Sequence, residues 1–179
     1  MFEIQTSDIP GVCSLRSPGN RDLRGSFHKL MHAPTLAAAG LNTDFAEVYC
    51  STSVRGVVRG MHFQKPPHQH AKLVWCLAGA VTDVILDLRR GSPRYGRAIA
   101  FELEGTTPSG VYIPEGCAHG FAVQSAEATL LYLVTSIHAP AADAGIRWDS
   151  FGFDWPILQP ILSERDRTHP DFETFDSPF

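Results

Sequence analysis

The 179-residue sequence lacks the features that identify several classes of protein. No apolar run approaches the ~20 residues needed to span a bilayer. The first residues, MFEIQTSDIPGV, have neither the basic leader nor the apolar centre of a signal peptide. The net charge of −4 provides no basic surface for nucleic acid, although a few well-placed cations could bind a small anion. We therefore expect a cytoplasmic protein with no membrane or nucleic-acid partner.

Paired cysteines are absent as well. The four cysteines are scattered without a CxxC motif, which argues against a zinc knuckle and favours small buried packing residues in a reduced compartment. The overall composition, 44% hydrophobic and 19% charged, is that of an ordinary globular protein. The length suits one domain over residues 1–179, with a sizeable core.

Gly and Pro turns punctuate a series of strand patterns in the middle of the chain. The stretch KLVWCLAGAVTDVILDLR predicts two strands that turn at Gly79. Further strands are predicted at 97–103, 110–116, 119–125 and 128–136. Short strands at this spacing predict a mainly β fold, a sandwich or a jelly-roll barrel.

Helical signals are few. The segment APTLAAAGLN, residues 33–42, predicts a helix that stops at Gly40. The tail from residue 139 onward mixes turn and aromatic signals, and we expect short helices or coil packed outside the barrel.

Histidines concentrate in the stretch VVRGMHFQKPPHQHAKLVW. His68 and His70 have the spacing that puts two imidazoles on one face of a strand, and His119 ends the PEGCAH turn at 114–119, so three nitrogen ligands could converge. The PxGxxH pattern resembles a motif of metal-binding cupins. No Glu follows HQH at ligand spacing, and Lys72 would repel a divalent cation. A metal-dependent cupin isomerase or dioxygenase is therefore the alternative hypothesis.

An acid–base site would use different residues of the same region. His62 follows RGM and precedes the strand that carries Lys72, so a neutral imidazole and an ammonium could share one pocket. Tyr132 lies in the apolar run TLLYLVT, where a phenol needs a hydrogen-bond partner. Each residue alone is as well explained by packing or solvation. Their occurrence together with Arg59 and His119 favours a functional site.

Five motifs spread along the chain point to one family. They are RDLRGSF (21–27), VVRGMHFQKPP (57–67), KLVWCLAGAVTDVILDLRRGSPRYG (72–96), YIPEGCAHGF (112–121), and GIRWDSFGFDWP with PILSERD (145–166). Together they resemble the dTDP-4-dehydrorhamnose 3,5-epimerase family over nearly the whole chain. The resemblance implies a metal-independent cupin-fold isomerase without a cofactor. It also implies a homodimer that acts on nucleotide-diphosphate 4-keto-6-deoxy sugars in deoxysugar and polysaccharide biosynthesis.

The family chemistry assigns catalytic roles by resemblance. The C4 carbonyl acidifies the protons on C3 and C5, so inversion needs a base, an acid on the opposite face and a group that stabilises the enolate. His62 matches the base and Asp166 matches the aspartate that orients it. Tyr132 matches the acid, and Lys72 matches the cation near the C4 oxygen. A non-catalytic sugar-nucleotide binder would need no such set.

The resemblance also assigns substrate contacts. Arg59, His119 and Arg24 match residues that bind the diphosphate, and an arginine fork suits paired phosphate oxygens. We expect His68 and His70 on the rim of a loop, where a secondary substrate contact is possible. In the family the N-terminal region crosses to the partner barrel. That crossing would carry the substrate-binding residues Arg24, Phe27 and Lys29 across the interface.

Four of the substrate-binding positions depart from the family pattern. Lys29 stands where thymine-reading members commonly have Glu; Glu47 and Tyr49 replace Gln and Asn; and His138 replaces a second tyrosine. These positions lie near the nucleotide in relatives. We therefore expect retained chemistry with altered nucleotide recognition, for instance of a CDP- or GDP-linked sugar. Inversion at only one of C3 and C5 is also open.

Overall fold

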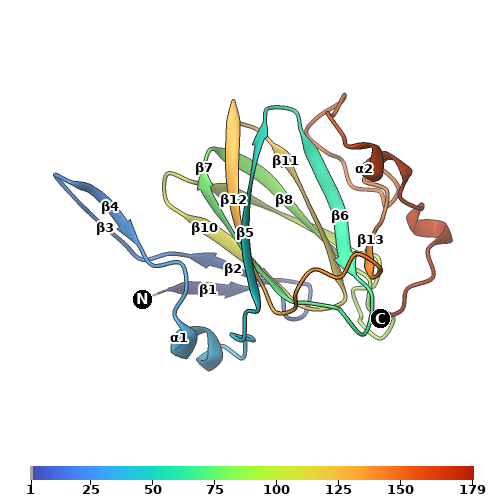
Figure 1. The fold of residues 1–179 in the computed structure, drawn as a ribbon, viewed down its shortest axis with the longest axis horizontal. Helices are drawn as coiled ribbons and strands as arrows, with labels where there is room; N and C mark the ends of the chain where they lie inside the picture. The colour runs from blue at the N-terminus through green and yellow to red at the C-terminus, as the bar shows by residue number, and fades with distance from the viewer. Residues whose placement is uncertain (1) are drawn as a thin grey trace.

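Two antiparallel sheets packed face to face form the body of the protein, in a computed structural model that describes residues 2–179 (Figure 1). The six-stranded sheet has the order β1 (Glu3–Thr6), β2 (Cys13–Arg16), β10 (Ser109–Ile113), β7 (Lys72–Ala78), β12 (Glu127–Val134) and β5 (Glu47–Val54). The five-stranded sheet has the order β13 (Asp143–Gly145), β6 (Val58–Gln64), β11 (Cys117–Val123), β8 (Ala80–Asp87) and β9 (Ala98–Glu104). The mainly β, jelly-roll prediction is confirmed.

Hydrophobic side chains fill three layers, one between the sheets and one on the outer face of each. The outer face of the six-stranded sheet carries Trp75, packed with Leu36 of helix α1 (Ala33–Ala38). The outer face of the five-stranded sheet carries Phe63, which packs against Phe175 and Phe179 of the C-terminal tail. Because both faces of β7, β8 and β11 are covered, these strands appear in the sequence as nearly continuous apolar runs.

The turn at Gly79 is confirmed. This residue has φ of +76°, and a Cβ there would lie 2.1 Å from the carbonyl oxygen of Glu127, so only glycine fits. Strands β9, β11 and β12 begin and end within two residues of the predicted bounds. Strand β10 ends earlier, at Ile113, because the following PEG forms a turn. Helix α1 ends at Ala38, before Gly40 at φ +75°.

His62 precedes β7, the strand that carries Lys72, as expected. It lies inside a strand of its own, β6, paired with His119 of β11 and with Gly145 of β13. The tail after residue 139 packs outside the five-stranded sheet, as expected, with helix α2 (Glu164–Thr168) and the 3-10 helix η1 (Phe172–Thr174). The sequence did not predict strand β13, in which this part of the tail pairs with β6 at the edge of the sheet.

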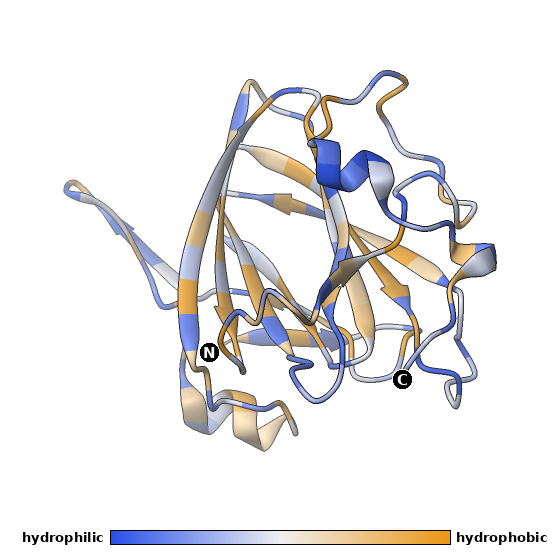
Figure 2. Cartoon of the chain, turned by 45° about the vertical axis from the view of Figure 1, so that its right-hand side comes forward, coloured by the Kyte–Doolittle hydropathy of each residue, from blue (hydrophilic) through white to orange (hydrophobic). Residues whose placement is uncertain are grey.

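The hairpin of β3 (Gly19–Asp22) and β4 (Gly25–His28) projects away from the body as an arm (Figure 1). Its hydrophobic side chains Leu23 and Phe27 are exposed rather than packed on the chain's own core. Figure 2 shows that hydrophobic residues dominate the barrel strands, whereas α2 is hydrophilic. No helix among residues 2–179 is long and apolar enough to cross a membrane.

Candidate active site

A cavity of about 400 Å³ opens between the two sheets, a size that suits a small-molecule site. Eight of the twelve site residues predicted from the sequence line it. The other four are Asp166, which lies behind His62, and Arg24, Phe27 and Lys29, which belong to the arm or directly follow it. The cavity therefore brings together residues from distant parts of the sequence.

His62 and Asp166 form a hydrogen-bonded pair at one side of the cavity. The His62 Nε2 lies 2.5 Å from Asp166 Oδ1, and Asp166 is 2% exposed. Burial raises the pKa of Asp166, but the nearby His169 ring and the hydrogen bonds with His62 and the Ser163 cap outweigh it and hold the pKa well below its usual range. An ionised carboxylate only accepts hydrogen bonds, so the His62 proton sits on Nε2 and the lone pair on Nδ1.

The electrostatics of His62 favour a neutral ring that can accept a proton. Burial lowers the pKa of His62, and the hydrogen bond to Asp166 opposes that shift. The position of Asp166 is also fixed, because its backbone N–H donates a hydrogen bond to the Ser163 side chain, which caps the N-terminus of α2. The pair is thus held between β6 and the C-terminal tail.

Tyr132 reaches the same cavity from the opposite sheet. It lies on β12 of the six-stranded sheet, whereas His62 lies on β6 of the five-stranded one. Its hydroxyl is 3.3 Å from Ser51 Oγ, and its ring stacks on Tyr49 with centroids 4.8 Å apart. Burial raises the pKa of Tyr132, so the phenol keeps its proton at neutral pH.

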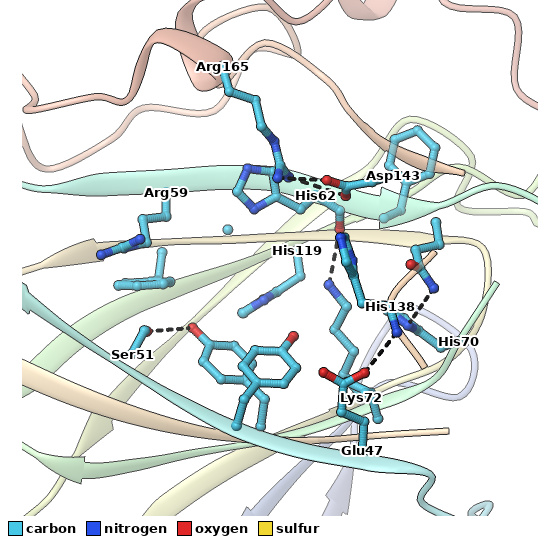
Figure 3. A pocket seen from close by; sticks show the side chains of 17 residues that line it. Glu47, Ser51, Arg59, His62, His70, Lys72, His119, His138, Asp143 and Arg165 are labelled. Carbon is cyan, nitrogen blue, oxygen red and sulfur yellow. Dashed lines mark hydrogen bonds and ion pairs between the residues drawn. The ribbon is translucent and has the colours of Figure 1, made fainter. Parts of the chain in front are cut away.

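Two further buried polar groups lie between these walls (Figure 3). The Lys72 Nζ donates to the carbonyl oxygen of His62 at 3.3 Å. Burial lowers the pKa of Lys72 to about 8, while the negative charges of Asp143 and Asp83 oppose the shift. His119, which is 4% exposed, donates from Nε2 to Asp83 Oδ2 at 2.7 Å.

Strand β5 forms one wall because alternate side chains of a strand face the same way. Glu47 accepts a hydrogen bond from the backbone N–H of His138 at 2.8 Å. Two and four residues further on, Tyr49 and Ser51 contact Tyr132. Ser53, the next in this series, accepts from the Nε of Arg59 at 2.9 Å. The predicted contacts at 47, 49, 59 and 138 thus lie on one continuous wall.

Nine residues that line the cavity were not among the predicted site residues, and three of these nine have ionisable side chains. Arg165 forms an ion pair with Asp143 at 2.7 Å over the cavity (Figure 3). Its place next to Asp166 in LSERD could have suggested it, whereas nothing in the sequence marked Asp143. His70 was expected on a loop rim but lines the cavity, and its position two residues before Lys72 is the signal that was overlooked.

The predicted HQH ligands do not converge. His68 is exposed, His70 Nδ1 accepts from the Gln64 amide at 3.2 Å, and His119 is bonded to Asp83. Among residues 2–179, one group of three possible metal ligands does come together, and it consists of His62, Asp166 and His169. The alternative hypothesis of a metal bound by HQH and His119 therefore finds no geometric support within the described residues.

The arrangement suits proton transfer on both faces of a bound molecule. A neutral imidazole backed by a carboxylate approaches from one sheet, and a protonated phenol approaches from the other. An ammonium lies beside them, where it can neutralise negative charge that develops on an oxygen.

Comparison with known proteins agrees with this geometry. The family model described as dTDP-4-dehydrorhamnose 3,5-epimerase matches residues 6–174. A dTDP-4-dehydrorhamnose 3-epimerase of Streptomyces niveus is 41% identical over 162 residues, which cover 89% of this chain and 78% of that protein.

Two solved structures are similar throughout. A 4-keto-6-deoxy sugar epimerase from the novobiocin gene cluster of Streptomyces spheroides matches with a TM-score of 0.90 and 38% identity, over 96% of this chain and 87% of that one. A dTDP-6-deoxy-D-glucose-3,5-epimerase of Legionella pneumophila in complex with dTDP-4-keto-L-rhamnose matches with a TM-score of 0.94 and 32% identity, over 98% and 95%.

The buried ring of His70 should make stability depend on pH. Burial, and then the charge of Lys72, lowers the pKa of His70 from 6.5 to about 3. Below pH 6.5 the unfolded chain takes up a proton that the folded chain refuses, so the folded state loses stability as the pH falls. Urea unfolding should therefore show that His70→Gln loses about 1–2 kcal/mol less than the wild type between pH 6.5 and 5.

The exposed His68 supplies the control, since His68→Gln should follow the wild type at both pH values. Identical pH dependence in His70→Gln and the wild type would show that the ring takes up its proton in the folded state as well.

Proposed function

The chain belongs to the dTDP-4-dehydrorhamnose 3,5-epimerase family, and from this premise we propose that its cavity inverts C3, C5 or both in a nucleotide-diphosphate 4-keto-6-deoxy sugar. The protein is an isomerase of the sugar-epimerase type, like its relatives. The observation that carries the proposal is the approach of His62 and Tyr132 to one cavity from opposite sheets. Inversion requires a proton to leave one face of the sugar and return to the other.

The reaction begins at the base. His62 takes a proton from the carbon next to the C4 carbonyl through Nδ1, and the C–H electron pair moves into the carbonyl to form an enolate. The Asp166 carboxylate stabilises the imidazolium that results, because it already accepts the hydrogen bond from Nε2. The Lys72 ammonium stabilises the negative C4 oxygen; a pKa of about 8 leaves it mostly protonated at neutral pH.

The reaction ends at the phenol. Tyr132 donates its proton to the other face of the enolate carbon, which completes the inversion, and solvent then restores the protonation of both residues. The stack on Tyr49 and the contact with Ser51 fix the direction of the hydroxyl. His119 was expected at the diphosphate, but its burial supports a contact with the sugar instead, whereas the exposed Arg59 suits the diphosphate.

The donor nucleotide is proposed to be dTDP. Relatives are named for dTDP sugars, and one solved relative holds dTDP-4-keto-L-rhamnose. The altered residues Glu47, Tyr49 and His138 had favoured another nucleotide on sequence grounds. They line the cavity beside Tyr132 and Lys72, where they would shape the sugar pocket. These three departures from the family pattern therefore affect which of C3 and C5 faces His62 more directly than they affect the choice of nucleotide.

We further propose a homodimer in which the arm of one protomer completes the site of its partner. Arg24 and Phe27 lie on a hairpin that projects away from the chain's own body, and neither lines its own cavity. The exposed Leu23 and Phe27 need a covering surface. An intermolecular contact would cover both side chains and bring the Arg24 guanidinium to the partner's substrate.

Base and acid can be separated by deuterium exchange in D₂O, followed by NMR. His62→Asn should lower deuterium incorporation by about 10²-fold or more, because no proton is abstracted. Tyr132→Phe should lower inverted product by about 10²-fold but still incorporate deuterium without inversion, since His62 can return a deuteron to the original face. Tyr95→Phe, which removes a phenol outside the cavity, is the matched control. Full inversion by either cavity variant would overturn the assigned role.

The donor and the reacting carbon can be read in one further experiment. dTDP-, CDP- and GDP-linked 4-keto-6-deoxyhexoses are incubated in D₂O, and deuterium is followed at C3 and C5. We expect exchange with the dTDP sugar, because the family's relatives use that donor. Exchange at both carbons identifies a 3,5-epimerase, and exchange at one identifies a single-site epimerase. A clear preference for CDP or GDP would contradict the proposed donor.

The shared site can be tested by subunit mixing. Arg24→Ala and His62→Asn should each be nearly inactive alone. If the arm acts in trans, an equal mixture re-formed from separated subunits should regain about a quarter of wild-type activity, since half of the dimers contain one intact site. An arm that acts in its own protomer gives no recovery, and a monomeric species in sedimentation would exclude the dimer itself.

A further inference from the structure

His169 stands directly behind the catalytic pair without belonging to the cavity. Its Nε2 lies 3.7 Å from Asp166 Oδ1, the same oxygen that accepts from His62 at 2.5 Å. The rings of His62 and His169 meet edge to face with centroids 5.7 Å apart. One ligand atom from each of the three residues lies within 4.8 Å of the others.

The convergence depends on Gly145. This residue pairs with His62 across β13 and β6, and a Cβ there would lie 2.4 Å from His169 Nε2. The missing side chain is therefore what lets the second imidazole approach the strand that carries the first. The backbone N–H of Arg147 donates to the Pro170 carbonyl at 2.9 Å, which fixes the residue after His169 against the same segment.

One nitrogen of the His169 ring lacks a hydrogen-bond partner among the described residues. Its Nε2 is buried and has no hydrogen-bond partner among residues 2–179, since 3.7 Å is too long for a hydrogen bond. A buried polar atom of this kind is costly unless something binds it. The proposed proton transfer uses the hydrogen bond from His62 to this oxygen and assigns no role to the His169 nitrogen.

We propose that His62, Asp166 and His169 form a transition-metal site, which binds Zn²⁺ or a similar ion and switches the enzyme off. Two imidazoles and a carboxylate are the donor set of zinc sites that keep one position open. Bonds of ~2.0–2.2 Å place ligand atoms less than about 4.4 Å apart, so the present separations need only small shifts. The inference rests on the proposed function only where it concerns inhibition.

The surrounding charges select the kind of ion. Lys72 and Arg165 lie near His62 and disfavour a cation, although Arg165 is neutralised by Asp143 and the pKa of Lys72 is about 8. A hard ion such as Mg²⁺ needs several oxygen ligands, which this cluster lacks. Nitrogen donors suit Zn²⁺, Co²⁺, Ni²⁺ and Cu²⁺. The site should therefore prefer these ions over Mg²⁺ and Ca²⁺.

A bound metal would prevent His62 from accepting the substrate proton. A metal on the Nε2 of His62 displaces the proton that now bonds Asp166, and the neutral ring then carries its proton on Nδ1. The lone pair that would take the substrate proton is lost. At the same time, Asp166 becomes a ligand and no longer supports an imidazolium. The metal in this site therefore opposes catalysis.

Binding is tested without substrate. The EDTA-treated, buffer-exchanged protein is titrated with Co²⁺, and the visible absorption bands of a four- or five-coordinate nitrogen–oxygen site are followed, with Zn²⁺ as competitor. We expect bands in the wild type that Zn²⁺ displaces and Mg²⁺ does not. Because no turnover is involved, a failure of the proposed epimerase activity would leave this result intact.

The variants locate the site. His169→Ala should abolish the Co²⁺ bands, and His169→Gln, which keeps more of the side-chain volume, should do so if the alanine variant folds poorly. His68→Ala, which removes the exposed histidine of HQH, should behave like the wild type. Absent bands in the wild type, bands that persist in both His169 variants, or bands lost in His68→Ala would each overturn the proposal.

Activity measurements test whether the bound metal inhibits the enzyme. Saturating Zn²⁺ should lower wild-type turnover by about 10²-fold, the usual contribution of a general base, and EDTA should restore it. His169→Ala should turn over without zinc, because His169 does not line the cavity, and should resist Zn²⁺. Equal inhibition of the wild type and His169→Ala would place the inhibitory ion elsewhere.

Discussion

The hydrogen bond between His62 and Asp166 joins the two parts of the molecule on which the site depends. Asp166 is almost fully buried, and a buried carboxylate without partners would cost several kcal/mol. The bond therefore requires the C-terminal tail to dock on the outer face of the five-stranded sheet. Phe175 and Phe179, packed on Phe63, provide the apolar contact that holds the tail there. The tail is thus a structural part of the candidate active site and not an appendage of the barrel.

The two-sheet architecture explains how one small fold can act on both faces of a sugar. The cavity of about 400 Å³ between the facing sheets has a size that suits a small molecule such as a sugar. His62 comes from one sheet and Tyr132 from the other, so their directions are set by the pleat of two different strands. Strand β5 has a neighbour on one side only, and its inward residues Glu47, Tyr49 and Ser51 can vary without disturbing the central strands. Under the proposed mechanism, substrate choice can therefore change while the acid–base residues are kept.

Much of the fold could be read from the sequence because the informative strands are covered on both faces. The runs that became β7 and β8 are mainly apolar, and Gly79 marks their turn because its positive φ is unfavourable for residues with a side chain. The earlier strands gave weaker signals. Strands β3 and β4 are polar and mostly exposed, because they do not pack on the chain's own core. Strand β13 has three residues and is defined only by its pairing with β6.

The sequence by itself determined the chemical types in the site, because the motifs around His62, Lys72, Tyr132 and Asp166 are contiguous and specific. Only the tertiary structure decided which groups meet. The Arg165–Asp143 pair forms where α2 lies beside β13, and His70 is partly buried next to Gln64 of β6. The contact of His169 with the His62–Asp166 pair likewise requires Gly145 to lie beneath its ring. Such contacts join residues far apart in the sequence, and no local pattern encodes the distance between them.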